Sequence, residues 1–353
     1  MSARRIESHI PCDDAHQKNR TGLLESPLDR SRFAAGKSNS PEVRRVVFHA
    51  DDFGMNTAVN LGILTAFRDG LLTSTALLAN APAAETACRE WGKFVVEHAS
   101  GSLFSSEKRR RVFEPLLPFD LGIHLNLTQG CPLTNVRFPS VLLDENGNFP
   151  GIGKLFARLN LASSAQRQAV EAELYAQVAW MCDHGLRPTH LNGHQYIEMI
   201  PQISIMIPEI LRYFSIGTVR VALEPGLVRN VLFRGDLAGW GLAQVKRHFA
   251  KAFRRRMLHA NASFTERFYG TSHAGRINRL LISRFLSQSM NVGTTEIGVH
   301  PAVSLTAEDL PFTDPWFDPL AKLRPMELQW LCDDDLVDEL AARGLSLGRL
   351  GSL

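Results

Sequence analysis

Two adjacent carboxylates, Asp51 and Asp52, stand at the end of a β-branched and aromatic run that is typical of a buried strand, and Gly54 follows them. Adjacent side chains at a strand end leave in different directions, so the two carboxylates cannot easily do the same job. One can bind a metal ion while the other stays free to move a proton. The alternative is a simple strand-to-loop turn, because Asp and Gly are common turn formers.

Two histidines, His124 and His194, lie at the ends of two further predicted strands. A divalent metal ion that catalyses hydrolysis needs about three protein ligands and an open position for water. Asp52, His124 and His194 supply one carboxylate and two imidazoles for such a site. For each histidine taken alone, a hydrogen-bonded residue in a strand turn is the alternative. Three candidates at equivalent positions favour the metal site.

The elements that must position these residues alternate along the chain. Strand-like runs occupy residues 46–50, 71–80, 119–128, 188–195, 219–225, 294–301 and 345–350. Helical periodicity occupies residues 56–68, 81–96, 165–184, 203–213, 245–259, 276–288, 326–331 and 335–343. Strands that alternate with helices indicate an α/β fold with a parallel sheet.

We expect residues 44–353 to form a single domain, since neither an internal repeat nor a linker interrupts them. An irregular, TIM-like (β/α) barrel is favoured over a doubly wound sheet. The reason is that polar residues, Asn80 and His300 among them, recur at the carboxyl ends of strands. Those ends converge on one mouth in a barrel, whereas distant strands of an open sheet could not all point to one place.

Residues 1–43 are rich in Arg, Ser, Asp and Asn and show little apolar periodicity. We expect a disordered or loosely attached extension there. A transit peptide is the alternative, but several acidic residues argue against it. The basic run within residues 100–117 is expected to be a solvated loop.

The composition excludes several classes of protein. A net charge of +3 over 353 residues does not demand nucleic acid as a partner. Five cysteines scattered singly indicate a reducing compartment and argue against a thiolate zinc site. No run approaches the roughly 20 apolar residues of a membrane span, and no apolar signal segment opens the chain. We expect a cytoplasmic protein, and the sequence leaves open whether it forms a homodimer.

The motifs together resemble the YdjC-like carbohydrate deacetylase family. The matching runs are His49 to Gly54 (HADDFG), residues 122–127 (GIHLNL), residues 188–195 (PTHLNGHQ) and residues 299–301 (VHP). The resemblance covers residues 44–350, and residues 220–225 are most similar to its hopanoid-biosynthesis-associated branch. It implies an irregular barrel, a divalent metal ion (Mg²⁺ or Zn²⁺), and removal of acetyl groups from N-acetylated sugars such as chito-oligosaccharides.

Carried over position by position, the resemblance assigns roles to five residues. Asp52, His124 and His194 would bind the metal ion. Asp51 would be the general base and His300 the general acid. No GxSxG nucleophile motif offers another hydrolytic mechanism.

The chain also departs from the family pattern. Tyr196 and Glu198 stand where the family usually has histidines, and Asn192 replaces a common aspartate. We expect these positions to lie around the metal ligands or in the substrate cleft. The predicted substrate-binding residues are Asn80, Asn126, Tyr196 and Arg220.

Two other functions compete with the deacetylase. A non-catalytic sugar-binding or regulatory protein on the same barrel is favoured by Tyr196 and Glu198, and disfavoured by the intact set of predicted ligands and catalytic residues. Hydrolysis of a phosphoester at the same metal would call for more cations at the strand ends. Arg220 is the only evident candidate there, so this function ranks last.

Overall fold

The computed structural model describes residues 44–99, 119–226, 237–304, 316 and 318–353, and every structural statement below concerns these residues. The predictions for residues 1–43 and for the loop at 100–117 lie outside them. No helix in these ranges is both long enough and apolar enough to cross a bilayer.

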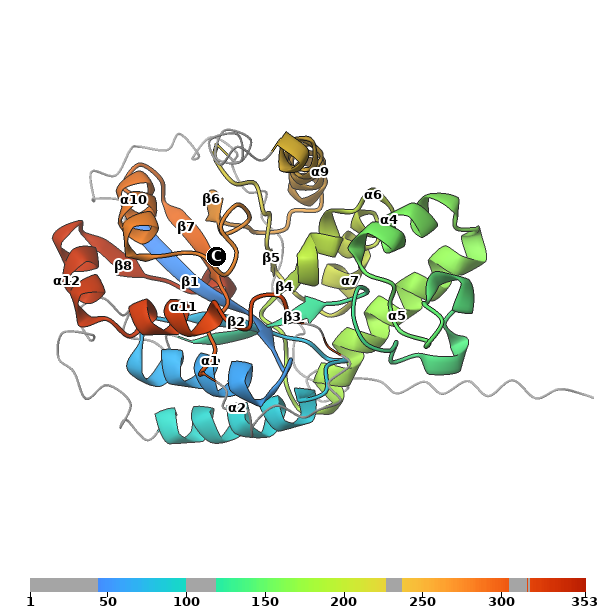
Figure 1. Ribbon diagram of the computed structural model, residues 1–353, viewed down its shortest axis with the longest axis horizontal. Helices are drawn as coiled ribbons and strands as arrows, with labels where there is room; N and C mark the ends of the chain where they lie inside the picture. The colour runs from blue at the N-terminus through green and yellow to red at the C-terminus, as the bar shows by residue number, and fades with distance from the viewer. Residues whose placement is uncertain (1–43, 100–118, 227–236, 305–315, 317) are drawn as a thin grey trace, which may run out of the picture. The chain divides into compact units, whose positions relative to one another are not determined.

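The described strands form one parallel sheet at the centre of the domain (Figure 1). They are β1 (Arg44–Phe53), β2 (Ser74–Leu77), β3 (Asp120–Leu125), β4 (His190–Gly193), β5 (Thr218–Val219), β6 (Arg267–Tyr269), β7 (Thr294–Val299) and β8 (Leu345–Leu347). The hydrogen-bonded order is β5-β4-β3-β2-β1-β7-β6, and β8 pairs with the first residues of β1. Seven strands therefore follow one curled path.

The curled sheet is not closed into a full barrel within the described residues. No pairing joins its end strands, β5 and β6; Thr218 of β5 instead forms an isolated bridge with Ser263, four residues before β6 begins. Because β5 has only two residues, it offers few backbone groups that could pair with β6. The prediction of a single α/β domain is confirmed, but a full TIM barrel is not: the irregular TIM-like barrel that the sequence predicts is, among the described residues, an open, curled half-barrel.

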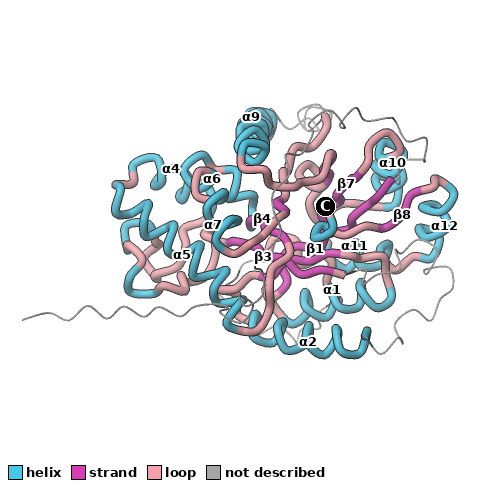
Figure 2. The backbone as a smooth tube through the Cα atoms, turned by 180° about the vertical axis from the view of Figure 1, so that it is seen from behind, coloured by secondary structure: helices cyan, strands magenta, loops and turns pink. Residues whose placement is uncertain are grey.

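Helices surround this sheet: Figure 1 shows α1 and α2 beside β1 and β2, and both Figure 1 and Figure 2 show α4 to α7 grouped beyond β3 and β4. They are α1 (Thr57–Asp69), α2 (Ala84–Ala99), α4 (Ile152–Leu161), α5 (Ser164–Asp183), α6 (Pro201–Ser204), α7 (Ile207–Tyr213), α9 (Leu237–His259), α10 (Arg279–Ser289), α11 (Arg324–Leu331) and α12 (Asp334–Ala342). Local sequence explains several starts. The Asn56 side chain accepts from the Val59 amide at α1, and Ser163 and Gln166 form a capping box at α5.

Two elements were missed by the sequence analysis. Strand β6 has three residues, too few to show a period of two. Helix α4 begins at Ile152, in a stretch for which the sequence analysis names no element, since Pro150, Gly151 and Gly153 suggest a turn.

The two faces of the sheet differ in polarity. Phe48 of β1 faces outward and packs near Trp330 of α11, with ring centroids 5.9 Å apart. The next residue, His49, faces inward, as the period of two requires. There it lies among other buried polar side chains, including Asp120, His190, Arg220 and Glu296. This polar interior contrasts with the aliphatic layers that usually fill a barrel.

Candidate metal and catalytic site

The end of β1 separates its two carboxylates by a local irregularity. The pairing of β1 with β2 shifts register between Ala50 and Phe53, as at a β-bulge. Asp52 adopts φ +72°, a left-handed conformation that aspartate tolerates better than most residues. The two side chains therefore point to different partners, as expected from their adjacency.

Asp52, His124 and His194 converge from β1, β3 and the turn η4 (His194–Met199) that follows β4. Each is buried, and one potential ligand atom from each lies within 4.8 Å of the others. Asp52 Oδ1 is 2.9 Å from His194 Nδ1 and 3.5 Å from His124 Nε2. The structure thus brings together the three predicted ligands.

The nitrogen atoms of this cluster suit a metal ion. Asn192 Oδ1 lies 2.8 Å from His124 Nδ1, and since an amide oxygen only accepts, Nδ1 carries the hydrogen. His124 Nε2 faces Asp52 Oδ1 at 3.5 Å; burial disfavours the imidazolium, but the Asp51 and Asp52 carboxylates outweigh it and raise the pKa of His124, so a bound cation would replace the proton on Nε2. His194 Nε2 is buried without a hydrogen-bond partner among the described residues. The cluster thus contains two imidazoles beside a carboxylate, and the Asn192 amide orients one of the imidazoles. A ligand set of this kind fits a divalent transition metal.

Asp51 lies beside this cluster, held by other partners. Its oxygens accept from Arg220 Nη1 at 2.7 Å and from Asn192 Nδ2 at 3.0 Å. Burial opposes ionisation, but the Arg220 guanidinium and neighbouring histidines outweigh it, and the pKa of Asp51 lies well below its usual value. Asp51 is therefore a carboxylate at neutral pH.

Asp52 is held in the same way from a distant part of the chain. Arg324 of α11 donates Nη2 to Asp52 Oδ2 at 2.7 Å and Nε to Asp318 at 2.7 Å. Burial again disfavours the charge, and Arg324 and His194 more than compensate, so the pKa of Asp52 is well below its usual value. A charged, oriented Asp52 remains available to a cation.

His300 follows β7 on the side of the site nearest Asp51. Its Nε2 lies 3.8 Å from Asp51 Oδ2, and its backbone amide donates to Glu327 Oε2 at 2.6 Å. Burial lowers the pKa of His300, although the two aspartates oppose this. The imidazole is therefore neutral at pH 7 and close to the carboxylate that would exchange a proton with it.

The predicted substrate residues Asn80 and Asn126 contact one another and the loop after β3. Asn126 Nδ2 donates to Asn80 Oδ1 at 2.9 Å, and both side chains donate to the carbonyl of Gln129. Their amides are thus engaged in holding this loop. A direct contact with substrate stays a prediction.

The other two, Tyr196 and Arg220, both lie against the ring of Phe268. Arg220 is completely buried and its guanidinium carbon lies 5.1 Å from the Phe268 ring centroid. Tyr196 follows Gln195, and both adopt left-handed backbone conformations, with φ of +64° and +54°. Two consecutive residues of this kind next to a predicted metal ligand mark local strain, a common feature of functional sites.

Sequence reasoning missed several residues that contact this site. They are His49, His190, Glu296, Arg324 and Glu327. The first two could have been found, because they lie two residues before Asp51 and Asn192 and so share the inner face of their strands. Arg324 and Glu327 carry no such local signal.

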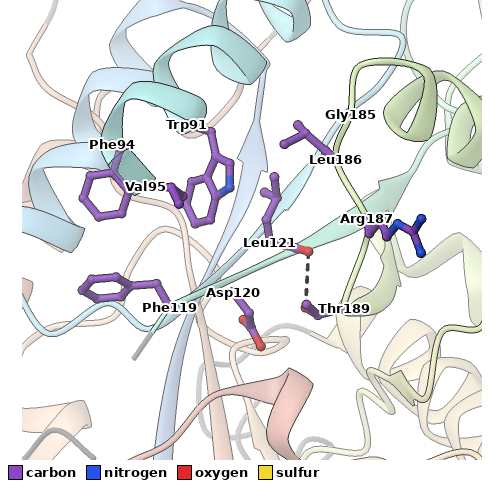
Figure 3. Close-up of a pocket in the computed structure, with 10 residues that line it drawn as sticks. All are labelled: Trp91, Phe94, Val95, Phe119, Asp120, Leu121, Gly185, Leu186, Arg187 and Thr189. Carbon is purple, nitrogen blue, oxygen red and sulfur yellow. Dashed lines mark hydrogen bonds between the residues drawn. The ribbon is translucent and has the colours of Figure 1, made fainter. Parts of the chain in front are cut away.

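A separate cavity of about 230 Å³ opens at the amino end of β3, where Asp120 begins the strand (Figure 3). Its lining consists of Trp91, Phe94, Val95, Phe119, Asp120, Leu121, Gly185, Leu186, Arg187 and Thr189. This lining is mainly apolar and contains none of the predicted site residues. The chemistry therefore belongs to the carboxyl ends of the strands, not to this cavity.

The matches to known proteins cover the part of the chain that contains these site residues. A family model described as YdjC-like protein matches residues 45–342. A carbohydrate deacetylase from Geobacillus stearothermophilus is 29% identical over 309 residues, which cover 86% of this chain and 96% of that protein. A carbohydrate deacetylase from Clostridium beijerinckii is 26% identical, over 73% of this chain and 81% of that protein.

Among solved structures, one from Enterococcus faecalis, described as a cellobiose-phosphate cleavage protein, superposes with a TM-score of 0.65. It covers 88% of this chain and 98% of that one, at 18% sequence identity. At this identity the likeness concerns the fold alone.

Proposed function

This chain belongs to the YdjC-like protein family, and on that basis we propose that it is a metal-dependent carbohydrate deacetylase that hydrolyses the acetamido group of an N-acetylated sugar. The observation that carries the proposal is the convergence of Asp52, His124 and His194 beside a separate carboxylate, Asp51. Relatives named carbohydrate deacetylases that align with most of this chain support the sugar substrate.

Asp52, His124 and His194 would hold the metal ion. Their two imidazole nitrogens favour zinc or a similar transition metal over magnesium, which prefers oxygen ligands. A bound divalent cation would polarise the amide carbonyl and lower the pKa of a water molecule. Arg324 keeps Asp52 charged and oriented for this role.

Asp51 would act as the general base. Its low pKa makes it a weak base, so it can accept a proton only from a water that is already acidified. Arg220 and Asn192 each occupy one acceptor site on its oxygens, and a carboxylate has about four, which leaves room for the water. Both partners also fix the direction of the carboxylate.

His300 would protonate the departing amine. Its Nε2 lies 3.8 Å from Asp51 Oδ2, so a small shift brings the two groups into hydrogen-bond reach. The proton that Asp51 takes from water can then pass to His300 and on to the amine nitrogen as the C–N bond breaks. Because burial lowers the pKa of His300, the imidazolium gives up its proton readily.

A non-catalytic sugar-binding protein is the alternative, favoured by Tyr196 and Glu198 at positions where histidines were expected. It is the weaker proposal, because sugar binding alone does not require a buried Asp-His-His cluster next to a second oriented carboxylate. The cytoplasmic location and the hopanoid-associated branch stay predictions of the sequence, and whether the protein forms a homodimer stays open.

The experiment measures metal content and acetate release together. Purified protein is loaded with zinc or magnesium, and acetate is assayed on a panel of N-acetylated mono- and oligosaccharides. We expect the wild type to retain metal and release acetate, and His194→Ala to lose both, while the exposed His259→Ala serves as the matched control. Equal metal content in wild type and His194→Ala would refute the ligand set. Metal binding without acetate release from any sugar would favour the non-catalytic alternative.

A further inference from the structure

A chain of hydrogen-bonded side chains runs down the inside of the sheet from Asp51. Arg220 Nη2 lies 2.7 Å from His49 Nδ1, and His49 Nε2 lies 2.7 Å from His190 Nε2. His190 Nδ1 lies 2.9 Å from Thr189 Oγ1. The Thr189 hydroxyl donates to the Leu121 carbonyl at 3.2 Å, at the cavity on the other end of the strands (Figure 3).

Arg220 fixes the direction of this chain because a guanidinium can only donate. Its Nε donates to Glu296 at 2.6 Å and its Nη1 donates to Asp51 at 2.7 Å. Its Nη2 therefore donates to His49 Nδ1, which must offer a lone pair. One cation thus orients Asp51 and His49 together.

The tautomers of both histidines follow from this donor. With Nδ1 accepting, neutral His49 carries its hydrogen on Nε2 and donates it to His190 Nε2. His190 must then carry its own hydrogen on Nδ1, which it donates to the Thr189 hydroxyl. In this one arrangement, each side chain of the hydrogen-bonded series from Arg220 through His49 and His190 to Thr189 has a partner.

The opposite tautomer of His49 is the competing state. It would place the hydrogen on Nδ1, which lies 3.1 Å from Asp51 Oδ1 and could donate to it. The same hydrogen would then face the Nη2 donor of Arg220, and His49 Nε2 would need a donor from His190. In that state His49 competes with Arg220 for the carboxylate, and the direction of Asp51 is no longer set by Arg220 alone.

We propose that His190 is a positioning residue for catalysis, which fixes the His49 tautomer and thereby holds the Arg220–Asp51 pair in the geometry of the general base. The effect on turnover rests on the proposed deacetylase function. The tautomer itself does not depend on it. The hydrogen bonds of His190 go to His49 and Thr189 rather than to a predicted metal ligand, and His190 acts through His49.

Two further observations support this role. Gly122 of β3 faces His190, and a Cβ at Gly122 would collide with the imidazole ring, so the sequence leaves space for this ring in this position. Both histidines are completely buried. Burial and the adjacent Arg220 lower the pKa of His49 to about 4, and burial and His49 lower that of His190, so the pair is neutral at pH 7.

The first test reads the tautomers directly. The zinc-loaded full-length protein is labelled with ¹⁵N-histidine, and the ring nitrogens of His49 and His190 are assigned by comparison with the His49→Gln and His190→Gln variants. We expect His49 to show a protonated Nε2 and a bare Nδ1, and His190 the reverse. A protonated Nδ1 on His49 in the wild type would overturn the proposal.

The second test separates positioning from folding. His190→Leu removes the acceptor, and His190→Gln can restore it with a side-chain oxygen. We expect His190→Leu to shift the His49 tautomer and to lower kcat by about 10- to 100-fold with little change in KM, as for other orienting partners. His190→Gln should recover most of kcat, and the exposed His259→Leu controls for loss of a histidine.

The outcomes of the two tests are distinguishable. Equal losses of kcat in His190→Leu and His190→Gln, with the His49 tautomer unchanged, would show a merely structural role and overturn the proposal. If His190→Leu does not fold, the His49 tautomer in the wild-type spectrum and the kcat of His190→Gln still decide whether His190 is a positioning residue. If the wild type releases no acetate at all, the proposed function fails, while the spectrum still decides the tautomer.

Discussion

Glu198 is a buried carboxyl group whose ionisation should destabilise the fold. It lies in the turn η4 after β4, completely buried, with its Oε2 against Gly193. Neither of its oxygens has a hydrogen-bond partner among the described residues. Burial therefore raises the pKa of Glu198 from 4.5 to about 8.

The sign of the pH effect follows from these two values. Between pH 4.5 and about 8 the unfolded chain has lost this proton while the folded chain retains it, so raising the pH favours unfolding. At about 1.4 kcal/mol for each pKa unit, the full step corresponds to roughly 5 kcal/mol, an upper bound for a group that water can reach on relaxation. Below pH 4.5 the group contributes no such penalty.

Glu198→Gln isolates this contribution, because the amide has the same shape and does not titrate. Urea denaturation of the metal-free protein, at intervals from pH 4.5 to 8.5, gives the free energy of unfolding of variant and wild type. The difference between them should increase with pH in favour of the variant by up to about 5 kcal/mol. Any constant penalty for burying the amide cancels, since only the pH dependence is compared.

The exposed Glu145→Gln provides the matched control for the loss of a carboxylate. A flat difference for Glu198→Gln would refute the reasoning. It would mean that Glu198 finds a compensating partner in the folded chain. A difference that decreases with pH would show that the folded state stabilises the carboxylate.

Three shorter predictions follow from the site and the fold. Asp51→Asn should keep the metal and lose about 10²–10⁴-fold in kcat when kcat is measured at saturating metal. Asp52→Asn should instead bind the metal more weakly than the wild type, and the reverse pattern would exchange the roles of the two aspartates. Gly122→Ala should lower the free energy of unfolding by about 1–3 kcal/mol, since its methyl group collides with His190, and an unchanged urea midpoint would contradict this. A chain that begins at residue 42 should melt within a few degrees of the full-length protein, and a large drop would show that residues 1–41 contribute to stability.

The sequence by itself determined the parts of the site that depend on local pattern. A strand that ends in two aspartates and a glycine is a local feature, and so are the histidines at the ends of β3 and β4. Period-two alternation places His124 and Asp51 on the inner face once the strands are parallel, and His194 follows directly after β4. The family motifs added the order of these residues along the chain.

The closure of the sheet was decided only by the tertiary structure. Residues 219–225 read as a full strand, yet β5 contains only Thr218 and Val219, and β6 showed no period at all. Whether two end strands pair depends on how many backbone groups they bring to the same edge. That number is set by the three-dimensional path of the chain, so the polar strand ends that favoured an irregular TIM-like barrel could not predict that the sheet stays open among the described residues.

The partners of the predicted residues were likewise decided by the fold. Arg324 reaches Asp52 across 272 positions of the chain, and Arg220 reaches Asp51 across 169. Nothing near either arginine in the sequence indicates that its partner is one of the two distant aspartates, and nothing near Glu198 indicates that it is buried without a partner among the described residues. Ionisation, tautomer and orientation depend on distances through space between groups far apart in the chain, because burial and Coulomb interactions follow those distances rather than sequence separation.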